Sequence, residues 1–218
     1  MQQGAPVSRR PAPAPRVRVR NRRGEGNRLR EDLIAAAREL LSGAESESDV
    51  SIRKVTRAAG VTPQAFYLQF ETLDDLLFAV YSAEFAELRS ALEAATSGLA
   101  PGPAALRAMC HAYVTFAAEH PSQYRLMMSV RGRVHEDWAP TELPGAPVIM
   151  LLNEAMAASA LDPEGALSPD AAVIQLWATL HGIVSLRDSR PTFPWPPLPQ
   201  MVDEAVASVV ARVRCSSP

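Results

Sequence analysis

The sequence is poor in the residues that build metal centres, disulfide frameworks and membrane spans. It has only two cysteines, Cys110 and Cys215, and its four histidines lie in separate segments without paired spacing. This distribution argues against a zinc site or a disulfide framework, so we expect two ordinary thiols and no metal. No apolar run approaches the length of a transmembrane helix, and no signal-peptide core follows the basic start of the chain. We therefore expect a soluble, cytoplasmic protein with no membrane partner.

Local motifs of catalysis and cofactor binding are also missing. The sequence contains no glycine-rich phosphate loop, no nucleophile elbow and no carboxylate pair with local motif support. An enzyme would need a site assembled from distant residues. We therefore expect a protein that is not an enzyme and that uses no cofactor.

Charge is distributed unevenly along the chain. Residues 1–30 contain nine arginines and one acidic residue, Glu25, although the whole chain has 22 basic and 24 acidic residues. The composition of the first residues, rich in Pro, Arg and Ala, predicts a disordered arm over residues 1–26. Its prolines break the amphipathic helix that a mitochondrial transit peptide needs. Such an arm can neutralise nucleic-acid phosphates without reading sequence.

Apolar residues recur at three- and four-residue spacing, and alanine is abundant, so the predicted fold class is all-α. The proline-rich stretch 191–199 indicates a stiff connector or, alternatively, a ligand for a proline-recognising domain. Besides two short helices between 51 and 70, helices are predicted at about 27–41, 73–96, 104–119, 122–130, 148–160, 169–188 and 198–213.

Two short apolar-periodic runs between Ser51 and Phe70 are separated by Gly60. Gly60 suits a turn whose backbone conformation is costly for residues with a Cβ. Thr62 can cap the second run through its hydroxyl, and Pro63 suits the first helical position because its missing N–H has no partner there. These features predict a helix-turn-helix that binds double-stranded DNA.

Polar side chains left outside the apolar stripes are candidates for DNA contact. The polar side chain of Gln64 does not suit a core, and its amide can form hydrogen bonds to the edge of a base. Tyr67 has two interpretations, since it can contact DNA or fill the core as an aromatic. The full set of DNA-binding candidates is Ser51, Arg53, Thr62, Pro63, Gln64, Tyr67, Gln69 and Thr72, with Arg20, Arg22, Arg23 and Arg28 from the basic N-terminal region.

Residues 27–96 resemble the N-terminal part of the TetR family of one-component transcriptional regulators. The matching positions include Ile52, Val55, Ala58–Val61, Ala65–Tyr67 and Phe70. Two positions differ, since Gln69 stands where the family commonly has His and Leu73 where it commonly has Lys. Further along, Trp177-x-x-x-His181–Gly182 and the run Tyr113 to Met128 resemble the Trp-His-Gly class of TetR C-terminal domains.

The resemblance implies an arm at 1–26, a DNA-binding domain at 27–72 and a helical ligand-binding and dimerisation domain at 73–218, with helix 73–96 connecting the two domains. It also implies a homodimer on a pseudo-palindromic operator and a repressor released by a small-molecule effector. The sequence does not decide between repression and activation. The alternative is an all-helical small-molecule-binding or scaffold protein without specific operator recognition.

Candidates for the remaining sites lie in the C-terminal two thirds. Trp177 and His181 are one helical turn apart, and they either line a pocket or pack in the core. The ligand-binding candidates are Tyr113, Phe116, Met127, Met128, Trp177 and His181. The dimer-interface candidates are Val184, Val206 and Val210, on two helices that suit a four-helix interface.

Overall fold

The computed structural model describes residues 25–43, 49–128, 143–160 and 164–213. Within these ranges the chain forms α-helices and no strand, so the all-α prediction is confirmed. The helices are α1 (Glu25–Ser42), α2 (Ile52–Ala58), α3 (Pro63–Phe66), α4 (Leu73–Ala95), α5 (Pro103–Glu119), α6 (Pro121–Met128), α7 (Ala146–Ala157), α8 (Pro169–Ser189) and α9 (Leu198–Val210).

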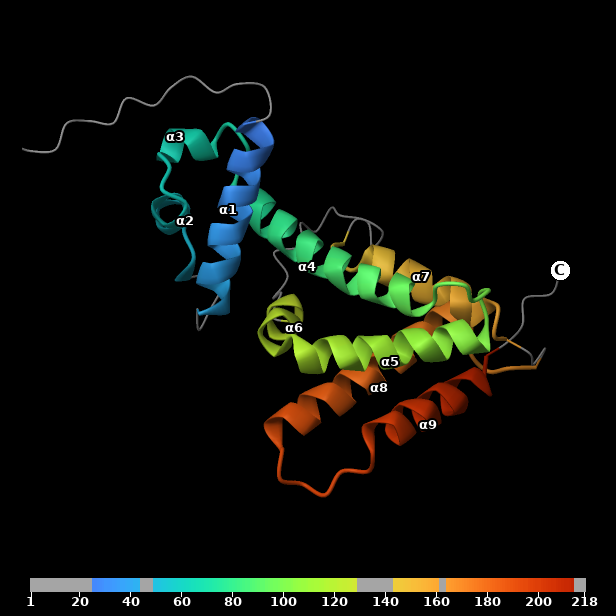
Figure 1. Cartoon of the computed structure of the whole chain (residues 1–218). Coiled ribbons are helices and arrows are strands. Elements are labelled where there is room, and N and C mark those ends of the chain that lie inside the picture. The colour runs from blue at the N-terminus through green and yellow to red at the C-terminus, as the bar shows by residue number, and fades with distance from the viewer. Residues whose placement is uncertain (1–24, 44–48, 129–142, 161–163, 214–218) are drawn as a thin grey trace, which may run out of the picture.

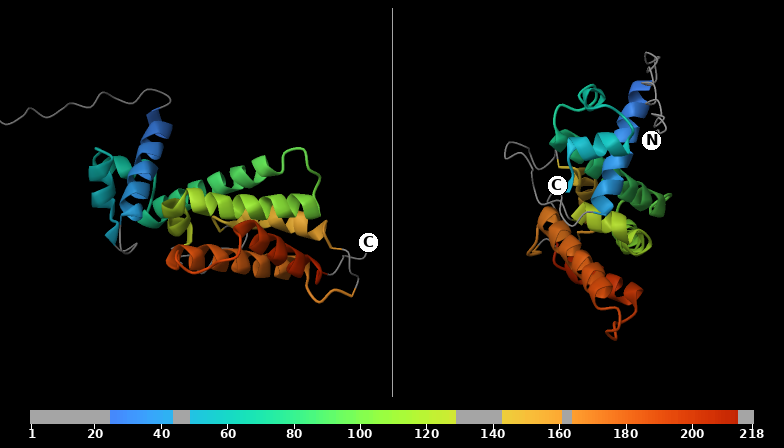
Figure 2. Two further views of the ribbon diagram at one scale, coloured as in Figure 1. Left: turned by 60° about the horizontal axis from the view of Figure 1, so that its bottom comes forward. Right: turned by 90° about the vertical axis from the view of Figure 1, so that its left-hand side faces the viewer.

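The helices form a small head and a larger body (Figure 1). The head consists of α1, α2 and α3 at one end of α4, and the body consists of α5 to α9 around the other end (Figures 1 and 2). α4 belongs to both parts, because Leu76 and Val80 pack in the core of the head and Leu88 and Leu92 pack in the core of the body. A single rigid helix therefore connects the two cores.

Local signals in the sequence account for the ends of the head helices. Gly60 has φ 65°, a left-handed conformation that favours glycine at the turn. The Thr62 hydroxyl accepts a hydrogen bond of 3.3 Å from the backbone N–H of Ala65, which caps α3. At the start of α4, Thr72 and Asp75 form the reciprocal capping box that their spacing predicts.

Three predicted helices end differently in the structure. α3 is regular only to Phe66, and the chain continues to Gln69 as a turn. α7 ends at Ala157. α9 ends at Val210 because the chain then turns, and the backbone N–H of Leu167 donates to the carbonyl of Arg212 at 2.9 Å. This bond draws Val213 into the core of the body, where it is fully buried.

One buried charge joins the head to the body. Glu84 of α4 is 1% exposed, and its carboxylate forms an ion pair with the guanidinium of Arg38 from α1. Arg38 also lies 3.6 Å from the carboxylate of Glu87, which accepts a hydrogen bond of 2.7 Å from Gln123 of α6. Burial raises the pKa of Glu84, and the charge of Arg38 opposes that rise. α1, α4 and α6 are thus joined by one polar cluster, formed by Arg38, Glu84, Glu87 and Gln123.

We expect Arg38→Met to lower the free energy of unfolding by about 2 kcal/mol, because Glu84 would be buried without its counter-charge. Glu84→Gln in the Arg38→Met background should restore most of that loss. Urea denaturation of both variants measures the effect. The matched control is Arg89→Met, which breaks the exposed Arg89–Glu93 pair and should cost less than about 1 kcal/mol. Equal losses in the single and double variants would contradict this account.

Candidate DNA interface and ligand cavities

The exposed surface of α3 and of the turn after it holds the best candidates for base contact. Gln64 is exposed, and Tyr67 is 60% exposed. The interpretation of Tyr67 as a core aromatic is wrong, because the neighbouring Phe66 fills that place with a fully buried ring that meets the Tyr67 ring edge-on at 5.3 Å. Leu68 is 74% exposed, and the sequence pattern did not single it out. An exposed leucine beside polar groups suits contact with a thymine methyl group.

The three serine and threonine hydroxyls among the candidates differ in what they can still offer to a phosphate. Ser51 and Thr62 cap α2 and α3 by accepting backbone N–H groups, so each hydroxyl keeps a proton to donate. The Thr72 hydroxyl accepts from the N–H of Asp75 and donates to the carboxylate of Asp75 at 2.9 Å. Its proton is already engaged, which weakens the case for Thr72 as a DNA ligand.

Positive charge in the head is concentrated on α2. Arg53 is exposed as predicted, and Lys54 and Arg57 are exposed beside it. The sequence pattern did not single out Lys54 or Arg57, although Arg53 and Arg57 are four residues apart and therefore lie on one face of α2. The other candidates in the head are the exposed Arg28 and Pro63 and the half-buried Gln69, while Arg20, Arg22 and Arg23 lie outside the described residues.

A chain of hydrogen bonds crosses the body from Trp177 to Ser185. The Trp177 indole N–H donates to the Tyr113 hydroxyl at 3.2 Å, and that hydroxyl lies 2.8 Å from the Tyr124 hydroxyl. The Tyr124 hydroxyl lies 2.7 Å from His181 Nδ1, and His181 Nε2 lies 3.3 Å from the Ser185 hydroxyl. Three of the ligand-binding candidates, Tyr113, Trp177 and His181, therefore belong to one network.

The indole N–H of Trp177 donates and cannot accept, so the Trp177 end of the network has a fixed direction. Beyond it either tyrosine hydroxyl can be the donor, because the Tyr113 oxygen that accepts from Trp177 can accept a second hydrogen bond. Burial raises the pKa of both Tyr113 and Tyr124, so their hydroxyls keep their protons.

Ser185 and Tyr124 both line a cavity of about 400 Å³ between α5, α6, α8 and the start of α9. We name it the Ser185 cavity. Its walls include Val114 and Ala117, and its charged groups are Arg125, Arg187 and Asp188. None of the six ligand-binding candidates lines this cavity: Tyr113, Phe116 and Met127 are buried in the core, and Met128, Trp177 and His181 are half-buried. The network places His181 directly behind two lining hydroxyls.

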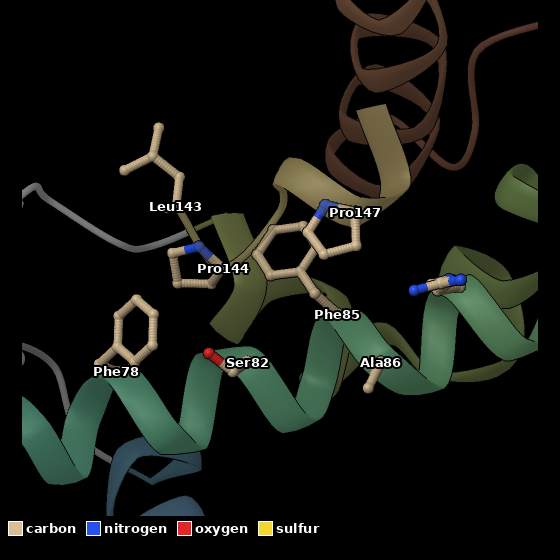
Figure 3. A pocket seen from close by; sticks show the side chains of 8 residues that line it. Phe78, Ser82, Phe85, Ala86, Leu143, Pro144 and Pro147 are labelled. Carbon is tan, nitrogen blue, oxygen red and sulfur yellow. The ribbon is translucent and has the colours of Figure 1, made fainter. Parts of the chain in front are cut away.

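A second cavity, of about 240 Å³, lies on the opposite side of α4 against the start of α7 (Figure 3). We name it the Phe85 cavity. Phe78, Ser82 and Phe85 project from α4 toward Pro144 and Pro147, which face them from the other wall. The lining is apolar except for Ser82 and for Arg89.

The three dimer-interface candidates lie mostly inside the protomer. Val206 is 7% exposed and packs in the core of the body, so it offers little area to a partner. Val184 and Val210 are half-buried against the same core. The exposed apolar face of α8 runs instead through Ile174 and Leu186, which are 50% and 53% exposed.

Residues 106–213 match the family model described as the tetracyclin repressor-like C-terminal domain. A solved structure of a TetR family transcription regulator from Marinobacter aquaeolei VT8 is 16% identical, with a TM-score of 0.62 over 88% of this chain and 98% of that chain. The C-terminal part of the chain belongs to the TetR family.

Two further solved structures resemble this TetR-family protein over most of both chains. A protein of unknown function from Rhodococcus sp. RHA1 is 27% identical, with a TM-score of 0.60 over 84% of this chain and 94% of that chain. The regulator FadR from Bacillus subtilis, in complex with stearoyl-CoA, is 12% identical, with a TM-score of 0.59 over 84% and 99%. Among the helices of the described residues, none is long and apolar enough to cross a membrane.

In this TetR-family protein, Tyr124→Phe should lower the free energy of unfolding by about 1–2 kcal/mol, because it leaves two buried polar atoms without their partner. Those atoms are the Tyr113 hydroxyl and His181 Nδ1. Urea denaturation measures the loss, and a Tyr124→Phe variant as stable as the unaltered protein would contradict this account.

Proposed function

We propose that this TetR-family regulator is a repressor whose dimer leaves a pseudo-palindromic operator when a small molecule fills the Ser185 cavity. The observation that supports this proposal most directly is the position of α6. Tyr124 of α6 lines the cavity and packs in the core of the body, whereas Leu126 of the same helix packs in the core of the head. A ligand that moves α6 therefore acts on both cores.

The coupling needs a ligand that prefers one position of α6. Tyr124 and Arg125 face the cavity, and Gln123 of the same turn donates to Glu87 in the polar cluster at the head. A molecule that binds better when Tyr124 and Arg125 have shifted also weakens the contacts of Gln123 and Leu126. The ligand then shifts the equilibrium between two positions of the head, and its differential affinity for the two states sets the size of that shift.

The lining of the Ser185 cavity favours an effector with a hydrogen-bond acceptor or an anionic group. Ser185 and Tyr124 contribute hydroxyl groups to the lining, and Arg125 and Arg187 outnumber Asp188. Because Arg125 lies 3.6 Å from Asp188, Arg187 carries the charge that is not balanced within the lining. Apolar walls from α5 suit the rest of such a molecule. FadR from Bacillus subtilis, which has a similar fold, was solved with stearoyl-CoA, a molecule that combines an acyl chain with anionic groups.

We infer that the dimer forms through the exposed face of α8. Ile174, Ala178, Gly182 and Leu186 recur at four-residue spacing, and a Cβ added to Gly182 would meet no atom within 4 Å. The small residues in the middle of this face allow close approach of a second helix, as in a four-helix interface.

Ala178→Glu should convert the dimer to a monomer, because it puts two like charges opposite each other at the centre of a twofold interface. The molar mass from size-exclusion chromatography with light scattering measures this. Ala94→Glu, at an exposed position on α4, is the matched control and should leave the dimer intact. A dimeric Ala178→Glu variant would place the interface elsewhere.

Titration of the duplex next to the protein's own gene against a scrambled duplex, at several salt concentrations, tests operator recognition. Gln64→Ala should reduce discrimination between the two duplexes by about 1–3 kcal/mol, because a base contact is lost. Deleting residues 1–23 is the matched contrast, since losing phosphate contacts should weaken both duplexes together and flatten the salt dependence. Equal binding of both duplexes by the unaltered protein would favour the alternative of a scaffold without operator recognition.

A further inference from the structure

Leu68, directly after α3, is the most exposed large apolar side chain in the part of the chain that the structure describes. It lines neither the Ser185 cavity nor the Phe85 cavity, and it does not pack against the core of the head, which Phe66 and Phe70 fill. A single exposed leucine is ordinary on a protein surface. The position of Leu68 in the head therefore decides what it can contact.

The backbone holds Leu68 on the same face as Gln64. The Leu68 N–H donates to the carbonyl of Ala65 at 3.3 Å, and Tyr67 keeps a helical backbone with φ −68° and ψ −5°. The chain therefore continues along the helical path of α3 into the turn. Gln64 and Leu68 are four residues apart and both exposed, so they lie one turn apart on one outer face.

This face offers contacts that differ from those of α2. In a helix-turn-helix the second helix enters the major groove while the first crosses the backbone. α2 has the exposed Arg53 and Arg57, which form no ion pair with other described residues. Thr62–Gln69 carries no charge, and the nearest exposed acids along the chain are Asp49 and Glu71. The face of α3 therefore offers hydrogen bonds and apolar contact rather than charge.

The proposed dimer leaves Leu68 uncovered. α3 and α8 lie apart in every view of the molecule (Figures 1 and 2). A second copy that packs on Ile174 and Leu186 of α8 would therefore not reach the outer face of α3. In the dimer this face stays open to DNA.

The major groove presents one apolar group, the C5-methyl group of thymine, and an exposed aliphatic side chain can contact it. Glutamine suits adenine, because its amide can form two hydrogen bonds with N6 and N7. A rise of about 1.5 Å per residue separates Gln64 from Leu68 by roughly 6 Å along the helix. Successive base pairs are about 3.4 Å apart. The two side chains therefore reach bases within about two base pairs of each other.

We propose that Leu68 contacts the 5-methyl group of one thymine in each operator half-site, within about two base pairs of an adenine that Gln64 contacts. The proposal rests on operator recognition by the head, and it adds the chemistry by which two bases are recognised. Leu68 is then a specificity-determining residue that distinguishes thymine from bases without a methyl group.

The experiment uses the tightest-binding duplex that the full chain selects from a random-sequence pool. Each thymine is replaced in turn by deoxyuridine, which lacks only the 5-methyl group and keeps the base pairing. At one position per half-site, uracil should weaken binding about fourfold, the effect of losing one buried methyl contact. The Leu68→Ala variant should bind the thymine and uracil duplexes equally.

Three further measurements locate the contacts. Leu68→Met keeps an apolar side chain and should keep most of the sensitivity to uracil. Leu99→Ala removes an exposed leucine beyond the end of α4 and should leave the fourfold effect unchanged. Replacing adenines by 7-deazaadenine, which lacks N7, should weaken binding at the base that Gln64 contacts, and the Gln64→Ala variant should not respond to that replacement.

A preferred sequence without any effect of uracil would overturn this proposal and leave operator recognition intact. Sensitivity to uracil that persists in Leu68→Ala would also overturn it, because the methyl group would then act through another residue or through the shape of the DNA. A selection that returns no preferred sequence would refute operator recognition, and this proposal with it.

Discussion

The burial of one carboxylate, that of Glu84, constrains the arrangement of head and body. Glu84 lies on α4 between the residues that fill the two cores, and its charge is tolerated there because Arg38 of α1 reaches it. Apolar packing alone would let α1 slide along α4 at a small cost, because dispersion contacts are not directional. Sliding that separates Arg38 from Glu84 leaves an uncompensated buried charge, which is strongly unfavourable. The head is therefore held at a defined angle, and α6 is joined to the same polar cluster by the hydrogen bond from Gln123 to Glu87.

This constraint sets how strongly a ligand must prefer one position of the head, in binding free energy, to move it. A full switch between two states needs a ligand that prefers one of them by about 5 kcal/mol. A movement of α6 that only loosens Gln123 and Leu126 costs less than one that breaks the Arg38–Glu84 pair, since Arg38 keeps its buried partner. The Ser185 cavity touches α6 and not α1, so it is suited to the smaller change.

The sequence predicted those features that depend on neighbours along the chain. Gly60, the Thr62 cap and the Thr72–Asp75 box are local, and the structure contains all three. The predicted ligand residues were chosen by motif and by spacing on one helix, and such reasoning cannot separate a lining side chain from one lying just behind it. Tyr124 and Ser185, which line the cavity, belong to segments that the motifs cover. Their role depends on contacts with His181, which is 57 residues from Tyr124 in sequence and one helical turn from Ser185. Likewise, no periodicity indicates that Glu84 meets Arg38, because the partner comes from another helix.

At both positions where the sequence departs from the family pattern, the side chain is half-buried. Leu73, where the resemblance implies a phosphate-binding lysine, packs against the core of the head, and Gln69 is half-buried. Positive charge is instead exposed on α2, at Arg53, Lys54 and Arg57. In a helix-turn-helix the first helix crosses the backbone and the second enters the major groove. Phosphate contacts position the protein without carrying sequence information. Under the proposed operator recognition, phosphate contacts from α2 in place of the start of α4 would change which residues determine the salt dependence, and they would leave base recognition to the exposed side chains of α3 and its turn.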